Sequence, residues 1–203
     1  MSFIKKDFSS ASECILNEDL FIYPTDTAYA LGTNALSDNA LLKLLKYKGN
    51  RKNKNISVAF SDIDMIQDFA YVDDRALLLI NKYLPGKLTL ILKKRESKFS
   101  QYISNDNTIG VRIPNRLDLL NLIKSIQIPI TVTSANISDN PTPFSIKEYL
   151  TTTPKDKVNL ISLIIDSGKI ESEVSTIIDI SSKKINVLRE GDIKKEEILS
   201  NFD

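Results

Sequence analysis

Apolar residues in this chain follow two kinds of pattern, which predict strands and helices in succession. The continuous apolar run from Leu20 to Tyr23 is typical of a buried strand, and Pro24 ends it. Similar runs predict strands over residues 56–60, 88–92, 108–113, 129–133, 160–165, 175–179 and 185–188. Helical spacing predicts helices over residues 9–17, 38–49, 63–69, 73–83, 116–126, 193–201 and a short one from 145, with 93–107 and 151–158 as loops. This order predicts an α/β protein.

Two of the predicted strands run directly into polar side chains. Thr25, Asp26 and Thr27 follow the first strand before the chain turns at Gly32, and Ser134 and Asn136 follow the strand 129–133. Because ligands of open α/β sheets bind at strand ends, these two ends predict a shared cavity. An ordinary turn, whose hydroxyl groups bind local backbone, is the alternative for the Pro-Thr-Asp-Thr string.

Cations lie close to these polar positions in the predicted topology. A helix capped by Asp38 ends near Lys48 and leads into a basic segment with Arg51, Lys52 and Lys54. Two arginines, Arg112 and Arg189, come at the ends of later strands. Cations with short hydroxyl and amide side chains suit a polyanion beside a small zwitterion. A solvated loop is the alternative interpretation of the basic segment.

Composition narrows the chemistry further. The 203 residues fit one domain, 1–203. The chain has 27 Lys and Arg against 26 Asp and Glu, so its net charge of +1 gives no argument for nucleic-acid binding. With no histidine, Ser-His-Asp and Cys-His mechanisms are excluded, and the single cysteine, Cys14, is predicted to be a small buried residue of the first helix. The two common nucleotide-binding loops are missing, and no apolar stretch is long enough for a membrane span, so we expect a cytoplasmic protein. Catalysis would rely on positioning and charge neutralisation.

Six short segments follow one another in a recognisable order. They are Tyr23 to Gly32, Leu84 to Thr89, Val111 to Pro114, Thr133 to Ser138, Ser175 to Asp179 and Leu188 to Gly191. This series resembles the ordered motifs of the YrdC family, the threonylcarbamoyl-AMP synthases. The resemblance extends over nearly the whole chain and is to the short, single-domain form of the family. It implies a twisted mixed β-sheet flanked by helices, a fold shared with dihydroxybutanone-phosphate synthases, with a large concave positive cavity.

The resemblance also implies a reaction and partners. L-Threonine, bicarbonate and ATP would give threonylcarbamoyl-AMP and diphosphate, with Mg²⁺ bound through the ATP phosphates and without metal ligands from the protein. A separate transferase complex would place the threonylcarbamoyl group on adenosine in tRNA, to which this protein would bind weakly. The alternatives are a non-catalytic RNA- or nucleotide-binding member of the family, and a related carbamoylation enzyme that uses another amine.

Site residues follow from the same resemblance. The threonine-binding positions would be Thr25, Ser57, Arg112, Val132 and Ser175. The ATP-binding positions would be Lys48, Lys52, Thr108, Ser134, Asn136, Thr142 and Arg189, with Lys48 and Arg51 as catalytic cations. The chain departs from the family pattern at three positions, where Ala30 and Asp139 replace glycine and Asn50 replaces arginine.

Overall fold

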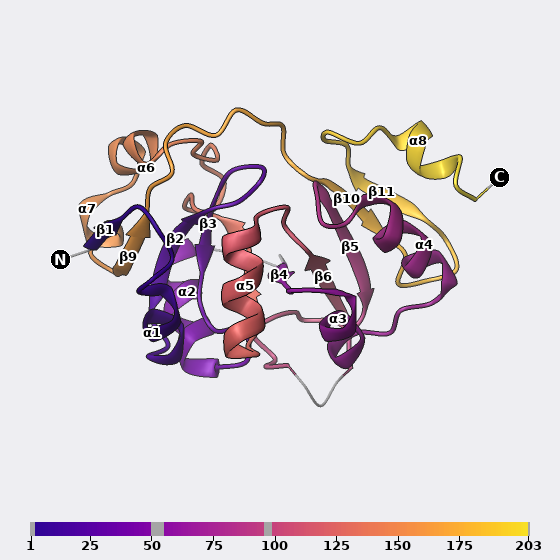
Figure 1. The fold of residues 1–203 in the computed structure, drawn as a ribbon, viewed down its shortest axis with the longest axis horizontal. Coiled ribbons are helices and arrows are strands. Elements are labelled where there is room, and N and C mark those ends of the chain that lie inside the picture. Colours follow the sequence, from indigo (N-terminus) through magenta and orange to yellow (C-terminus); the bar gives the residue numbers. More distant parts are fainter. Residues whose placement is uncertain (1–2, 50–54, 96–98, 203) are drawn as a thin grey trace.

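The strands form two neighbouring sheets, which we name sheet A and sheet B, in a computed structural model that describes residues 3–49, 55–95 and 99–202 (Figure 1). In spatial order, sheet A contains β1 (Phe3–Lys5), β9 (Ile161–Ile165), β2 (Leu20–Pro24), β3 (Tyr29–Gly32) and β8 (Thr133–Ser134). Sheet B contains β11 (Asn186–Arg189), β10 (Thr176–Asp179), β5 (Leu88–Lys93), β6 (Thr108–Arg112), β4 (Val58–Ala59) and β7 (Ile130–Thr131). The chain begins in sheet A and ends beyond sheet B.

Both sheets are mixed. In sheet A, β2 runs parallel to β9 and antiparallel to β3, which in turn is antiparallel to β8. In sheet B, β5 runs parallel to β10 and antiparallel to β6, and β4 runs parallel to β6. The prediction of an α/β fold with mixed strand pairing and flanking helices is confirmed, with the strands divided between two sheets.

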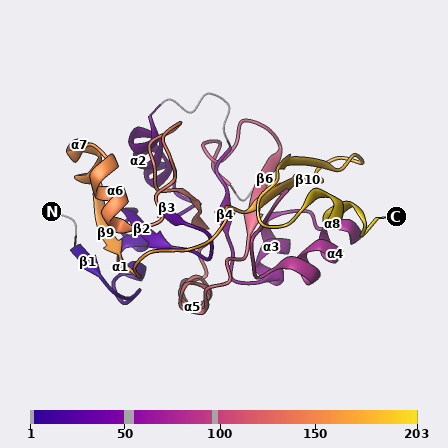
Figure 2. The same ribbon diagram turned by 90° about the horizontal axis from the view of Figure 1, so that it is seen from above.

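Helices cover the sheets and the space between them (Figure 2). They are α1 (Ala11–Leu16), α2 (Asp38–Lys48), α3 (Ile63–Phe69), α4 (Asp74–Tyr83), α5 (Leu117–Ile126), α6 (Ile146–Thr152), α7 (Lys155–Val158) and α8 (Lys195–Leu199). Both α1 and α2 pack against β2, α1 also packs against α5, and α4 packs against β5. Among the residues that the structure describes, no helix is long and apolar enough to cross a bilayer.

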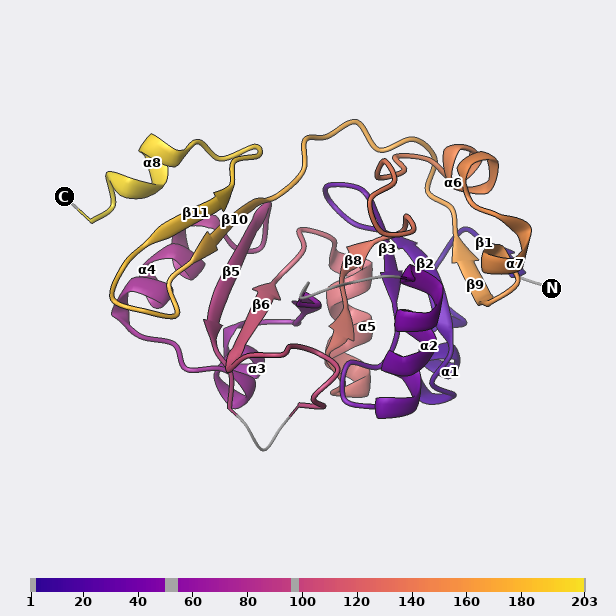
Figure 3. The same cartoon turned by 180° about the vertical axis from the view of Figure 1, so that it is seen from behind.

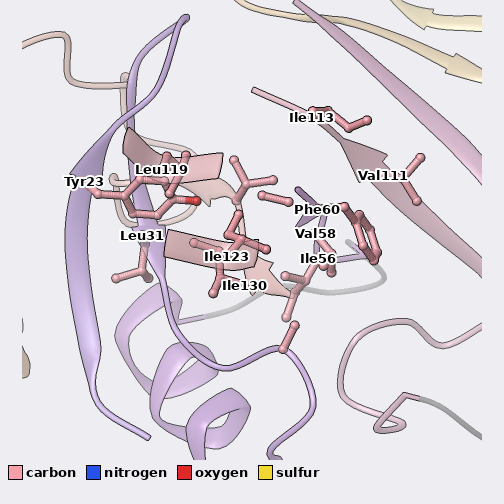
Figure 4. Close-up of a cluster of buried hydrophobic side chains, with 14 of the residues drawn as sticks. Tyr23, Leu31, Ile56, Val58, Phe60, Val111, Ile113, Leu119, Ile123 and Ile130 are labelled. Atoms are coloured by element: carbon pink, nitrogen blue, oxygen red, sulfur yellow. The ribbon is translucent and has the colours of Figure 1, made fainter. Parts of the chain in front are cut away.

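A shared apolar core joins sheet A to sheet B beneath α5 (Figure 4). Leu119 and Ile123 of α5 are fully buried beside Tyr23 and Leu31 of sheet A and Ile130 of sheet B. Burying apolar side chains stabilises a fold by about 25 cal/mol per Å², so separating the sheets would expose this core to water at high cost. The core therefore fixes the relative positions of the strand ends that bear the polar residues.

One predicted strand is divided between the two sheets. Residues 129–133 are predicted as a single strand, whereas Ile130 and Thr131 pair with β4 in sheet B and Thr133 and Ser134 pair with β3 in sheet A. Val132 is the residue at which the chain passes from one sheet to the other. Local apolar pattern does not contain this information, because sheet membership depends on hydrogen bonds to distant strands.

Other sequence expectations were wrong at element ends. The chain turns at residues 25–28, and Gly32 ends the second strand of the resulting hairpin. The N-cap of α2 is Ser37, whose hydroxyl accepts from the backbone N–H of Ala40, while Asp38 is the first helical residue. The predicted loop 151–158 contains the end of α6 and all of α7. Cys14 is buried on α1 as predicted, and burial raises the pKa of its thiol to about 12, which makes it a poor nucleophile.

Candidate functional site

A cavity of about 460 Å³ is lined by residues from both sheets. Its lining residues are 25, 27–30, 48, 55, 57, 89, 112, 132–134, 136, 138–140, 142, 174, 175, 177 and 189. These residues include members of all six sequence motifs. Among the described lining residues, the cations are Lys48, Arg112 and Arg189, and Asp139 is the one carboxylate. The cavity therefore carries excess positive charge, as the motif resemblance implied.

The turn between β2 and β3 forms part of the cavity wall. The Thr25 hydroxyl donates to the carbonyl of Ala28 at 2.8 Å and accepts from the backbone N–H groups of Thr27 and Ala28 at 3.1 and 3.2 Å. The string 24–27 is thus a turn closed by its own hydroxyl group, and it also lines the cavity. The segment is therefore both an ordinary turn and part of the cavity wall, because the hydrogen bonds that close the turn also hold it in place beside the cavity.

Arg112 lies at the end of β6 and links the two sheets. Its guanidinium donates to Asp26 Oδ1 at 2.8 Å and to Thr27 Oγ1 at 3.2 Å, and the side chains of Arg112 and Asp26 are only 7% and 9% exposed. Burial lowers the pKa of Arg112 and the charge of Asp26 opposes that change, so the arginine keeps its proton. A fixed, charged guanidinium at a cavity wall is suited to bind a carboxylate.

The ammonium group of Lys48, at the end of α2, is bound to the segment that follows β8. It donates to the carbonyls of Ser134 and Asn136, both at 2.7 Å, and to Asn136 Oδ1 at 3.0 Å. The neighbouring Tyr47 hydroxyl donates to the carbonyl of Ala135 at 2.7 Å. Residues 134–136 are therefore held by the C-terminal end of α2, with the positive charge of Lys48 beside them.

Arg189 belongs to a second hydrogen-bonded group on the sheet B side of the cavity. Its Nε and one terminal nitrogen donate to the carbonyl of Ser175 at 3.0 and 2.8 Å, and that nitrogen also donates to Ser175 Oγ at 3.0 Å. Ser175 Oγ is in turn 3.1 Å from Thr89 Oγ1. The pKa of Arg189 is lowered mainly by burial and secondly by the positive charge of Arg112. The two guanidinium groups of the cavity therefore repel each other electrostatically.

A long connection between β9 and β10 runs from sheet A to sheet B across the top of the molecule (Figures 1 and 3). Its first part is held by Tyr29 of β3, whose hydroxyl donates to the carbonyl of Gly168 at 2.7 Å and accepts from the N–H of Ser167 at 3.0 Å. Its last part contributes Val174 and Ser175 to the cavity lining. Tyr29 therefore connects the wall formed by β3 to this segment.

Most predicted site residues lie together in the cavity. The structure brings together the predicted threonine positions Thr25, Ser57, Arg112, Val132 and Ser175 with the predicted ATP positions Lys48, Ser134, Asn136, Thr142 and Arg189. Thr108 lies outside the lining. Its hydroxyl donates to Asp106 Oδ1 at 2.6 Å and accepts from the side-chain amide of the lining residue Asn55 at 3.3 Å. Arg51 and Lys52 lie outside the described residues.

Sequence reasoning missed Thr89, which supports Ser175 from inside sheet B. It placed Asp26 and Thr27 at the cavity but did not find that they hold Arg112. Each of these residues lies inside one of the six motifs, so motif membership was the available signal. Their individual roles depend on contacts between distant segments.

Two of the three departures from the family pattern lie in the cavity, and Asn50 lies outside the described residues. Ala30 is opposite Tyr23 and Ser134 in the strand register, so its backbone lies between β2 and β8, and Ala30 lines the cavity. Asp139 has a φ of 71°, a left-handed conformation that glycine adopts without cost. The backbone at residue 139 thus keeps the conformation usual for glycine while carrying a carboxylate.

Comparison with known proteins places this fold and cavity in a family. The Sua5/YciO/YrdC family model, described as telomere recombination, matches residues 13–191. A Methanocaldococcus jannaschii protein is 36% identical over 98% of this chain and 88% of its own length, and the threonylcarbamoyl-AMP synthase of Pyrococcus abyssi is 33% identical over 88% of this chain. The crystal structure of P. abyssi Sua5 complexed with L-threonine superposes with a TM-score of 0.86 at 31% identity over 95% of this chain.

The fold and its cavity thus define an α/β protein of two mixed sheets, with a positively charged site that is lined by motifs distant in the sequence. The chain belongs to the Sua5/YciO/YrdC family. It spans about half of the length of its P. abyssi relatives, 52% of the synthase and 56% of the Sua5 chain in the crystal structure.

Proposed function

We propose that this protein is a threonylcarbamoyl-AMP synthase, which forms threonylcarbamoyl-AMP and diphosphate from L-threonine, bicarbonate and ATP. The observation that carries the proposal is that residues from all six family motifs line one cavity. A cavity of about 460 Å³ lies within the range of about 300–1,000 Å³ that is common for small-molecule sites.

The threonine subsite would be formed around Arg112. The guanidinium is held in place by Asp26 and Thr27 and would bind the threonine carboxylate. Ser57, Val132 and Ser175 would complete the subsite, with Thr25 contributing through the turn that its hydroxyl closes. That the relative Sua5 from P. abyssi was crystallised with L-threonine supports this choice of amino acid.

The ATP subsite would lie on the side of Ser134, Asn136, Thr142 and Arg189, with Thr108 beside it through Asn55. Lys52, the other expected ATP contact, lies outside the described residues. Because the Lys48 ammonium is already bound to three oxygen atoms, it would act on the phosphates through its charge and by holding residues 134–136. Among the described residues, no group of three or more His, Cys, Asp or Glu side chains could hold a metal ion. Mg²⁺ would arrive with ATP, bound through the phosphates, which is its usual mode.

The proposed chemistry has two steps. In the first, bicarbonate gives CO₂ and hydroxide, and the neutral amine of threonine bonds to the carbon of CO₂; the proton that the nitrogen loses converts the hydroxide to water, which leaves a carbamate. A carbamate oxygen then attacks the α-phosphorus in line, and the bond from that phosphorus to the bridging oxygen breaks and releases diphosphate. The protein would contribute orientation and positive charge, which suits a cavity without histidine. A separate transferase would then move the threonylcarbamoyl group to tRNA.

The test is to incubate the protein with ATP, Mg²⁺, bicarbonate and threonine or serine, and to measure diphosphate and an acyl-adenylate by mass spectrometry. We expect threonine- and bicarbonate-dependent product, which Arg112→Gln abolishes. Arg116→Gln is the matched control, because Arg116 pairs with Asp118 on the surface. Nucleotide or RNA binding without any adenylate would contradict the proposal and favour a non-catalytic member of the family.

A further inference from the structure

The buried pair formed by Asp26 and Arg112 has two unusual atoms. Asp26 Oδ2 and Arg112 Nε are the buried side-chain atoms that have no hydrogen-bond partner among the described residues. A buried polar atom without a partner costs about 1–3 kcal/mol, so each such atom needs an explanation. Both atoms belong to the Asp26–Arg112 ion pair, which joins the two sheets at the cavity.

The two members of this pair face the cavity differently. Arg112 lines the cavity, whereas Asp26 is not among the lining residues and therefore contacts the guanidinium from the protein side. Asp26 leaves Arg112 charged but makes the pair neutral overall. A ligand that approaches Arg112 thus meets the hydrogen-bond donors of an ion pair that has no net charge.

Arg189 provides the contrast within the same cavity. All of its described hydrogen bonds are to the neutral oxygens of Ser175, and among the described residues it forms no ion pair with a carboxylate. The charge of Arg189 is therefore not compensated in the way that Asp26 compensates Arg112. Among the described residues, the charge of Arg112 is thus compensated by Asp26, whereas the charge of Arg189 is not compensated by a carboxylate.

Two such guanidinium groups suit two different anionic ligands. A polyphosphate gains most from an uncompensated cation, and a neutral guanidinium–carboxylate pair attracts it little. A zwitterionic amino acid has no net charge, so it binds to the neutral pair through its carboxylate without an electrostatic penalty at its ammonium group. We infer that Asp26 is a specificity-determining residue, whose charge reserves the Arg112 subsite for an amino acid and excludes simple anions and polyphosphates. This inference rests on the proposed function.

The test measures binding without turnover. Isothermal titration would compare L-threonine with 3-hydroxybutanoate, which is threonine without its amino group, for the wild-type protein and for Asp26→Asn. Asparagine can retain the hydrogen bond to Arg112 but removes the charge. We expect the wild type to prefer threonine, and the ratio of the two affinities to fall at least about tenfold in the variant, because the anion gains from an uncompensated cation.

Thr27→Val is the matched control, since it removes the other hydrogen bond to Arg112 without changing any charge. It should alter both affinities and leave their ratio unchanged. An unchanged ratio in folded Asp26→Asn overturns the inference, and so does an equal fall in Thr27→Val.

A measurement on the wild type keeps the inference testable if the variants do not fold. Diphosphate should not compete with threonine for the Arg112 subsite, and competitive displacement would overturn the inference while leaving the proposed reaction intact. Failure of the wild type to bind threonine at all would overturn both this inference and the proposed function.

Discussion

The hydroxyl group of Thr176 is predicted to hold the sheet B side of the site together. Thr176 is fully buried, and its hydroxyl donates to the carbonyl of Ile193 at 2.7 Å and accepts from the N–H groups of Gly191 and Ile193 at 3.0 and 3.1 Å. Thr176→Val keeps the shape of the side chain but leaves three backbone groups without this partner. At about 1 kcal/mol for each group, the free energy of unfolding should fall by about 3 kcal/mol.

This loss can be measured by urea or thermal unfolding. For a chain of this size each kcal/mol lowers Tm by about 2–4 °C, so the expected decrease is about 6–12 °C. Thr176→Ser is the matched control, because it keeps the hydroxyl and loses one methyl group, which is worth about 0.8 kcal/mol. A valine variant as stable as the serine variant, or more stable, would show that the hydroxyl does not organise this segment.

Two further substitutions test the segments around the cavity. Gly191→Ala should lower the free energy of unfolding by about 1–3 kcal/mol, because a Cβ atom would lie 2.8 Å from the backbone carbon of Ser175 and even closer to the carbonyl of Val174; urea unfolding that matches the wild type would refute this contact. Tyr29→Phe should speed amide hydrogen exchange at Ser167 by releasing its hydrogen bond, whereas Tyr71→Phe, with an exposed ring, should not.

Much of the site could be predicted from the sequence because its residues lie in short motifs at strand ends. The apolar runs predicted most strand positions, and the polar residues after Tyr23 and after Thr133 were expected to share a cavity. Of the six predicted cations, Lys48, Arg112 and Arg189 line it, whereas Arg51, Lys52 and Lys54 lie outside the described residues. These predictions succeeded because strand formation and residue type are largely local properties of the chain.

The individual contacts of those residues were decided by the tertiary structure. The Thr25 hydroxyl closes its own turn, and the Lys48 ammonium is bound to residues 134–136. Asp26 and Arg112 are 86 residues apart in sequence and meet only because the two sheets share a core. Sequence by itself determined most of the polar groups that line the cavity. Only the folded chain determined which of their charges are neutralised, because charge compensation depends on distances between segments that no local pattern records.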